Sequence, residues 1–134
     1  ILRVGDKTSV FGPELTNAIS QIMNTYQQKH KSFKWQRKLM PGGTCESTAF
    51  CEYGYLSTCL CLPLGNYHNM SDVDRVIAKK IPAKIAPEII SVDDFHGLVT
   101  MLIVVCQELD KRRSPTLRAS LEARFHRFGK ILAD

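Results

Sequence analysis

The chain has no uninterrupted apolar segment long enough to cross a bilayer. Its longest apolar run, from Leu98 to Cys106, has the length expected of a helix in a protein core. The five cysteines are an odd number, and no stretch reads as a secretory signal, which argues against a framework of disulfides. We therefore expect a protein that does not enter a membrane and that resides in a reducing compartment, the cytoplasm.

Internal repeats and low-complexity segments are also absent. The 134 residues predict one domain, 1–134, and 44% hydrophobic with 23% charged residues is typical of a globular protein. An initiator methionine is missing, and the first residues, Ile1 to Val4, already resemble a buried strand. We therefore expect the chain to be the C-terminal part of a longer protein.

Positive charge is in modest excess, with a formal net charge of +5. Its densest part is Lys29–Lys38, which also contains two aromatic residues, as some nucleic-acid interfaces do. Phe33 and Trp35 alternate with Lys34 and Gln36, a pattern typical of a strand with one solvated face. We therefore expect no nucleic-acid partner.

The periodicity of apolar residues predicts an α/β fold. Strands are predicted at Ile1–Val4, Phe33–Leu39 and Thr58–Leu62, and helices at Pro13–Lys29, Cys45–Tyr53, Val92–Asp110 and Ser114–Ala133. This order predicts a mostly parallel sheet flanked by helices, a partial α/β/α sandwich. Thr58–Leu62 is apolar on both faces and is expected to be the central strand.

The second half of the chain contains one long irregular segment and two amphipathic helices. The segment from Met70 to Pro87 has room for a helical turn or two and otherwise reads as a surface excursion. Ser91 and Asp94 have the spacing of a capping box, which accounts for the Asp93–Asp94 pair. The next helix should bury one broad stripe: Phe95, Leu98, Val99, Leu102, Ile103, Cys106 and Leu109. The last helix, within 111–134, reads as an appended element.

Cysteine and histidine are the candidate reactive groups. Zinc knuckles need a CxxC pair, which none of the five cysteines forms, so core cysteines are the better interpretation. Cys45 follows a glycine turn and begins a helix, where the dipole lowers a thiol pKa. A thiol site formed by Cys45 and His68 is therefore one hypothesis, without a third residue to orient the pair.

A second hypothesis comes from the stretch between Met40 and His68. It contains PGGTCESTAF, then an apolar strand, then LPLGNYH. This order resembles the C-terminal part of the co-catalytic zinc aminopeptidases of the glutamyl and tetrahedral aminopeptidase type. Those enzymes have a GGTDA-like turn, an apolar strand, and an ending whose histidine binds metal. The similarity extends from about Ile1 to about Leu109.

The resemblance implies an α/β sandwich with a dinuclear zinc site. His68 would be one terminal zinc ligand, and Gly43, Thr44 and Cys45 would lie beside the peptide substrate. The chain departs from the family in having Cys45 in place of an aspartate and a longer Met70–Pro87 segment. The helix at Ser114–Ala133 is an addition.

The resemblance also places the remaining ligands and the general base upstream of Ile1. It therefore implies that this chain is one part of an aminopeptidase, that it is inactive alone, and that the complete protein forms a homo-oligomer. Apart from the thiol hypothesis, the competing interpretation is a non-catalytic α/β binding module that has lost the metal site.

Overall fold

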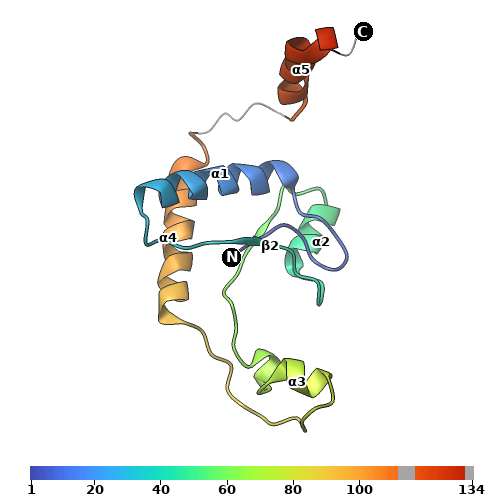
Figure 1. The fold of residues 1–134 in the computed structure, drawn as a ribbon, viewed down its shortest axis with the longest axis vertical. Coiled ribbons are helices and arrows are strands. Elements are labelled where there is room, and N and C mark those ends of the chain that lie inside the picture. The colour runs from blue at the N-terminus through green and yellow to red at the C-terminus, as the bar shows by residue number, and fades with distance from the viewer. Residues whose placement is uncertain (112–116, 132–134) are drawn as a thin grey trace.

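A computed structural model describes residues 1–111 and 117–131 of the chain. Figure 1 shows a small sheet beneath helix α1, a long helix α4 that crosses α1, and two outlying parts. The strands are β1 (Leu2–Arg3), β2 (Arg37–Lys38) and β3 (Cys59–Leu60). The helices are α1 (Pro13–Lys29), α2 (Glu46–Glu52), α3 (Val73–Ile77), α4 (Val92–Glu108) and α5 (Leu117–Phe128), with 3-10 turns η1 (Tyr67–Asn69) and η2 (Gly129–Ile131). None of these described helices is long and apolar enough to span a membrane.

Two residues of each predicted strand pair in one sheet, but it is mixed rather than mostly parallel. The strand order is β2-β1-β3, with β1 parallel to β2 and antiparallel to β3. In this register Leu2 lies opposite Arg37 and Leu60. The fold is therefore α/β with a small mixed sheet, and a parallel-sheet sandwich is not evident.

The prediction of a central strand at Thr58–Leu62 is wrong, because β1 occupies the centre and β3 is an edge strand. The backbones of Ile1 and Cys61 exchange hydrogen bonds of 2.9 and 3.0 Å, and Thr58 Oγ1 donates to the Arg3 carbonyl at 2.9 Å. Apolar residues on both faces indicate burial, but they do not determine which strands pair.

Local signals set the ends of α1 and α2 where the sequence predicts them. Pro13 occupies the first turn of α1, where its missing N–H has no cost. Helix α2 lies between Cys45 as N-cap and Tyr53 as C-cap. Gly54 follows with φ of +84°, and Tyr55 N–H donates to Phe50 at 2.9 Å, which closes a Schellman turn. This turn reverses the chain, so that β3 returns antiparallel to β1.

The core lies between the sheet, α1 and one face of α4. Its buried residues are Leu2, Ile19, Ile22, Met23, Met101 and Val105. The predicted buried stripe of α4 is wrong, since Phe95, Val99, Leu102, Ile103 and Cys106 are exposed. The helix is apolar on more than one side, and α1 packs on the side that carries Met101 and Val105. Ser91 is the N-cap as predicted, but its side chain makes no capping hydrogen bond.

The predicted excursion forms a small outlying part, seen below the sheet in Figure 1. Isolated antiparallel bridges pair Gly65 with Ile89 and Met70 with Ile85, which closes the segment on itself. Helix α3 supplies the expected helical turn or two within the segment that the bridge between Met70 and Ile85 closes. The predicted last helix is observed as α5 and η2, which Figure 1 draws apart from α1 and α4. The predicted start at Ser114–Pro115 and the end beyond Ile131 lie outside the described residues.

The packing between α1 and α4 gives a direct test of the core. Ile22 is 2% exposed and Ile77 in α3 is 73% exposed. Replacing Ile22 by alanine should lower the free energy of unfolding by about 2–4 kcal/mol, because the cavity is added to the lost apolar burial. The matched Ile77→Ala change should lower the free energy of unfolding by less than about 0.5 kcal/mol. Urea unfolding of both variants measures the difference, and equal effects would contradict this core.

Candidate functional site

The Asp6 carboxylate connects two loops that are far apart in the sequence. Its Oδ1 accepts hydrogen bonds from Thr8 N–H at 2.8 Å, Thr8 Oγ1 at 2.8 Å and Ser9 N–H at 3.0 Å. Its Oδ2 accepts hydrogen bonds from Cys45 N–H at 2.8 Å and from the Thr48 hydroxyl. One carboxylate thus satisfies five donors and joins the loop after β1 to the start of α2.

Further contacts fix the Gly42–Thr44 turn against the loop after β1. Lys7 N–H donates to the Gly43 carbonyl at 3.0 Å, and the hydroxyls of Thr8 and Thr44 are 3.2 Å apart. Ser9 Oγ lies 2.7 Å from Thr48 Oγ1. We call these residues, with Asp6 at their centre, the Asp6 network. The turn that was predicted to lie beside the substrate is therefore joined by hydrogen bonds to the loop after β1.

The environment of Asp6 favours its ionised form. The residue is 4% exposed, and burial alone would raise the pKa of its carboxyl. The hydrogen bonds from Thr48, the Cys45 amide and Thr8 outweigh this effect and hold the pKa far below its ordinary value of 3.8. Asp6 is therefore a charged hydrogen-bond acceptor that organises the loops. Near neutral pH its carboxyl is ionised and cannot act as a proton donor.

Glycines play two different parts around this network. A Cβ on Gly5 would clash with the Ser9 carbonyl and meet Leu39 Cδ1 at 3.2 Å, so the tight turn of the loop after β1 requires glycine there. At Gly42 and Gly43 an added Cβ would meet nothing within 4 Å. The space over the turn is therefore open.

His68 lies in the outlying part, in the 3-10 turn η1. Its side chain is exposed, as predicted, and the residue adopts a left-handed conformation with φ of 57°. Its backbone N–H donates to Glu88 Oε1 at 2.8 Å, and its ring packs on Tyr67 with centroids 4.0 Å apart. Among the described residues, no hydrogen bond involves the imidazole itself. A hollow of about 580 Å³ adjoins this turn; Tyr67, Asp72 and Arg75 are among its lining residues, and His68 is not.

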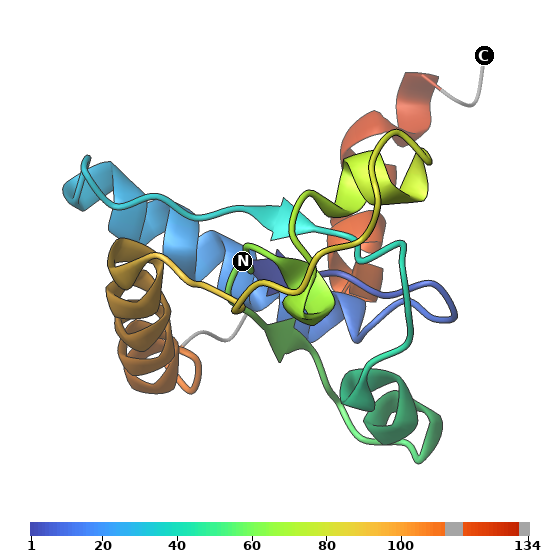
Figure 2. The same cartoon turned by 90° about the horizontal axis from the view of Figure 1, so that it is seen from below.

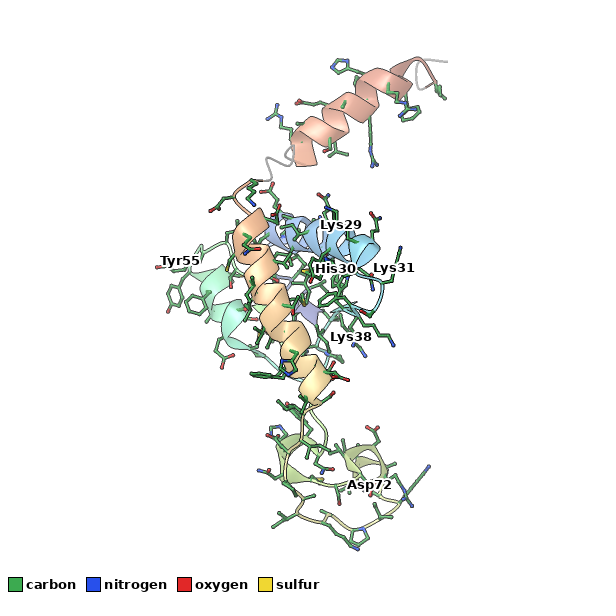
Figure 3. The ribbon with its side chains drawn as sticks, turned by 90° about the vertical axis from the view of Figure 1, so that its left-hand side faces the viewer. Lys29, His30, Lys31, Lys38, Tyr55 and Asp72 are labelled. Atoms are coloured by element: carbon green, nitrogen blue, oxygen red, sulfur yellow. The ribbon has the colours of Figure 1, made fainter. Side chains whose placement is uncertain are left out.

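The peptidase hypothesis also predicts that His68 lies next to the Gly42–Thr44 turn, and this prediction is wrong. The turn belongs to the Asp6 network before α2, whereas His68 belongs to the part that contains α3. Figure 2 also draws α2 and α3 apart. In Figure 3, Tyr55, just after α2, and Asp72, just before α3, lie in separate parts of the molecule. The cause is the bridge between Gly65 and Ile89, which folds the chain after β3 onto the segment before α4.

The same separation applies to the hypothesis of a Cys45–His68 thiol site. Cys45 is the N-cap of α2, and no hydrogen bond within the described part of the chain joins it to His68. The chain as described therefore does not assemble this pair.

The thiols near β3 form a local group with one cation. Burial, together with the neighbouring thiols of Cys45 and Cys61, raises the pKa of Cys59. Arg3 Nε donates to Cys61 Sγ at 2.9 Å. Cys59 and Cys61 are half-buried rather than fully buried, so the interpretation as core cysteines holds only in part.

A zinc site is not assembled by the described residues. No group of three or more histidine, cysteine, aspartate or glutamate side chains in residues 1–111 and 117–131 is arranged to hold a metal ion. Zinc sites in proteins use three or four protein ligands. His68 alone does not meet that requirement, so a zinc site at His68 would need ligands from outside these residues.

The sequence predicts that Asp6 is a turn residue, ahead of a role as a ligand. An aspartate after a glycine at a strand end is most often a turn residue, and Asp6 does make that turn through Thr8 and Ser9. Its second set of donors comes from residues 39 and 42 positions away. The hydroxyl-rich sequences Thr8-Ser9 and Thr44–Thr48 were the available signal, because a buried carboxylate needs several donors.

No protein-family model matches the chain, and no curated protein or solved structure shows significant similarity to it.

Proposed function

We propose that this chain is the C-terminal part of a zinc-dependent aminopeptidase and that His68 is its one metal ligand. Two observations support the proposal. The Met40–His68 stretch resembles the zinc aminopeptidases, and the His68 imidazole is exposed in the fold. The complete protein would remove N-terminal residues from peptides. The residues of this chain would position one ligand and form part of the surrounding wall.

One observation carries the proposal: the His68 imidazole is exposed, and no described residue bonds to it. A metal ligand needs one ring nitrogen free for the metal and a fixed ring orientation. Here the ring contacts Tyr67 in a tilted arrangement, with 46° between the ring planes, and the hydrogen bond from His68 N–H to Glu88 holds its backbone. Both ring nitrogens remain available to groups from outside the chain.

The backbone around His68 supports a functional role. Asn66, His68, Asn69 and Asp72 all have positive φ, between 50° and 57°. Left-handed residues other than glycine are uncommon, and strained positions of this kind concentrate at functional sites. The excursion therefore holds His68 in a conformation that an ordinary surface loop does not require.

The Asp6 network would have a separate role in this proposal. It orders the Gly42–Thr44 turn and leaves open space above the two glycines, where an extended peptide backbone could approach. Because the described residues do not complete a zinc site, we assign no catalytic step to this chain.

Activity measurements on two proteins test the proposal. The complete gene product should hydrolyse aminoacyl chromogenic substrates, and a chelator should abolish turnover until zinc or cobalt is restored. The 134-residue chain alone should leave the same substrates intact with either metal added. The described residues assemble no metal site, and the resemblance places the further ligands and the general base upstream of Ile1. A complete protein without chelator-sensitive activity would favour the non-catalytic binding module. Metal-dependent turnover by the chain alone would contradict the assignment of missing ligands.

A further inference from the structure

Helix α4 has a second apolar face that no described element covers. Its residues recur at helical spacing: Val92, Phe95, Val99, Leu102, Ile103 and Cys106. The first five are 39% to 69% exposed, although Met101 and Val105 on the other side are buried. In Figure 3 this helix lies in front of α1. We call this side the outer face of α4.

Helix α5 carries a complementary apolar stripe. Leu121, Phe125 and Phe128 lie on one side of the helix and are 45% to 64% exposed. We call these three residues the α5 stripe. Figure 1 draws α5 apart from α4 of the same chain. Both apolar surfaces are therefore without a partner in the described chain, and contiguous surfaces of this kind mark interaction sites.

Charge distinguishes the possible pairings of these surfaces. Helix α4 contains Asp93, Asp94 and Glu108 and no lysine or arginine. Helix α5 contains Arg118, Arg124 and Arg127 against one acidic residue, Glu122. Pairing α4 with α4 would bring like charges together, whereas pairing α4 with α5 brings opposite charges together.

We propose that α5 of one chain packs its stripe on the outer face of α4 in a second copy, and that the second copy does the same in return. Such an exchange is closed and two-fold symmetric, so it ends at a dimer. It covers both apolar surfaces in each chain. This interface is independent of His68 and of the proposed peptidase activity.

Light scattering after size exclusion, at tens to hundreds of micromolar, should give a dimer for the unchanged chain. Leu102→Asp on the outer face and Phe125→Asp on the α5 stripe should each weaken the dimer at least about tenfold, because a buried charge replaces an apolar anchor. The matched control is Ala123→Asp, which changes α5 on the side away from its stripe and should leave the dimer intact. Far-ultraviolet circular dichroism confirms that each variant keeps its helices.

Mixing the two disruptive variants distinguishes the reciprocal packing of α5 on α4 from other dimer arrangements. A Leu102→Asp chain keeps an intact α5, and a Phe125→Asp chain keeps an intact outer face, so the mixture should recover part of the dimer through one intact contact. Packing of α4 on α4 would instead give a dimer that is insensitive to Phe125→Asp. That outcome, or a monomeric unchanged chain with α5 folded onto its own α4 or left free, would overturn the proposal.

Discussion

Replacing Asp6 by alanine is expected to lower the melting temperature by roughly 5–10 °C, an effect at the large end for one substitution in a domain of this size. Five donors lose their acceptor, including the amides of Thr8, Ser9 and Cys45. Buried donors without an acceptor are costly. Asp6→Asn should be nearly as harmful, because its NH₂ group would face the donors that now meet Oδ2.

The control for this change is Asp110→Ala, which removes an exposed carboxylate with no recorded hydrogen bond in the described chain. Its melting temperature should change by no more than about 2 °C. Amide hydrogen exchange adds a local measurement, since the Cys45 amide should lose protection in Asp6→Ala before the core amides do. Equal melting temperatures for the two variants would contradict the organising role of Asp6.

The pH dependence of this effect follows from the lowered pKa of Asp6. A carboxylate with a lowered folded-state pKa stabilises the protein at pH values above its unfolded pKa, and this contribution is lost as the pH falls. The difference in stability between the unchanged chain and Asp6→Ala should therefore be constant near neutrality and narrow from about pH 4 downward. A difference that widens on acidification would contradict this account.

Replacing His68 should reduce the peptidase activity of the complete protein by at least about 100-fold, if His68 binds the metal as proposed. His68→Asn is the preferred change, because asparagine tolerates the left-handed backbone at this position whereas alanine is strained there. The exposed imidazole contacts only Tyr67 and makes no hydrogen bond in the described chain, so the melting temperature without metal should change little.

A matched control uses another exposed histidine. His96 lies on α4, and His96→Asn should leave turnover unchanged. Initial rates on an aminoacyl chromogenic substrate measure both variants. Normal turnover in His68→Asn, with the same zinc present, would contradict a metal-binding role.

Features with a local cause could be predicted from the sequence. Helix α1 runs from Pro13 to Lys29 as predicted, because the proline start and the apolar stripe lie within the helix itself. Helix α2 falls within the predicted range, and the exposure of His68 was also expected. In each case the deciding interactions lie within a few residues along the chain.

Features with a distant cause could not be predicted in this way. The position of β3 at the edge depends on which strand lies beside β1, and the buried face of α4 depends on where α1 packs. The two donors to Asp6 Oδ2, Cys45 and Thr48, come from beyond α1 in the sequence. The separation of His68 from the glycine turn depends on the bridge between Gly65 and Ile89. Periodicity contains no information about these pairings.

Zinc content tests the central proposal most directly. The complete protein, purified after exposure to excess zinc and extensive dialysis, should retain two zinc ions per chain, as the resemblance implies. His68→Asn should lose at least one of them, while His96→Asn keeps both, because loss of a ligand weakens metal binding and loss of an unrelated histidine does not. Elemental analysis per mole of folded protein gives the numbers. Equal zinc content in all three proteins, or no bound zinc in the unchanged protein, would contradict the account.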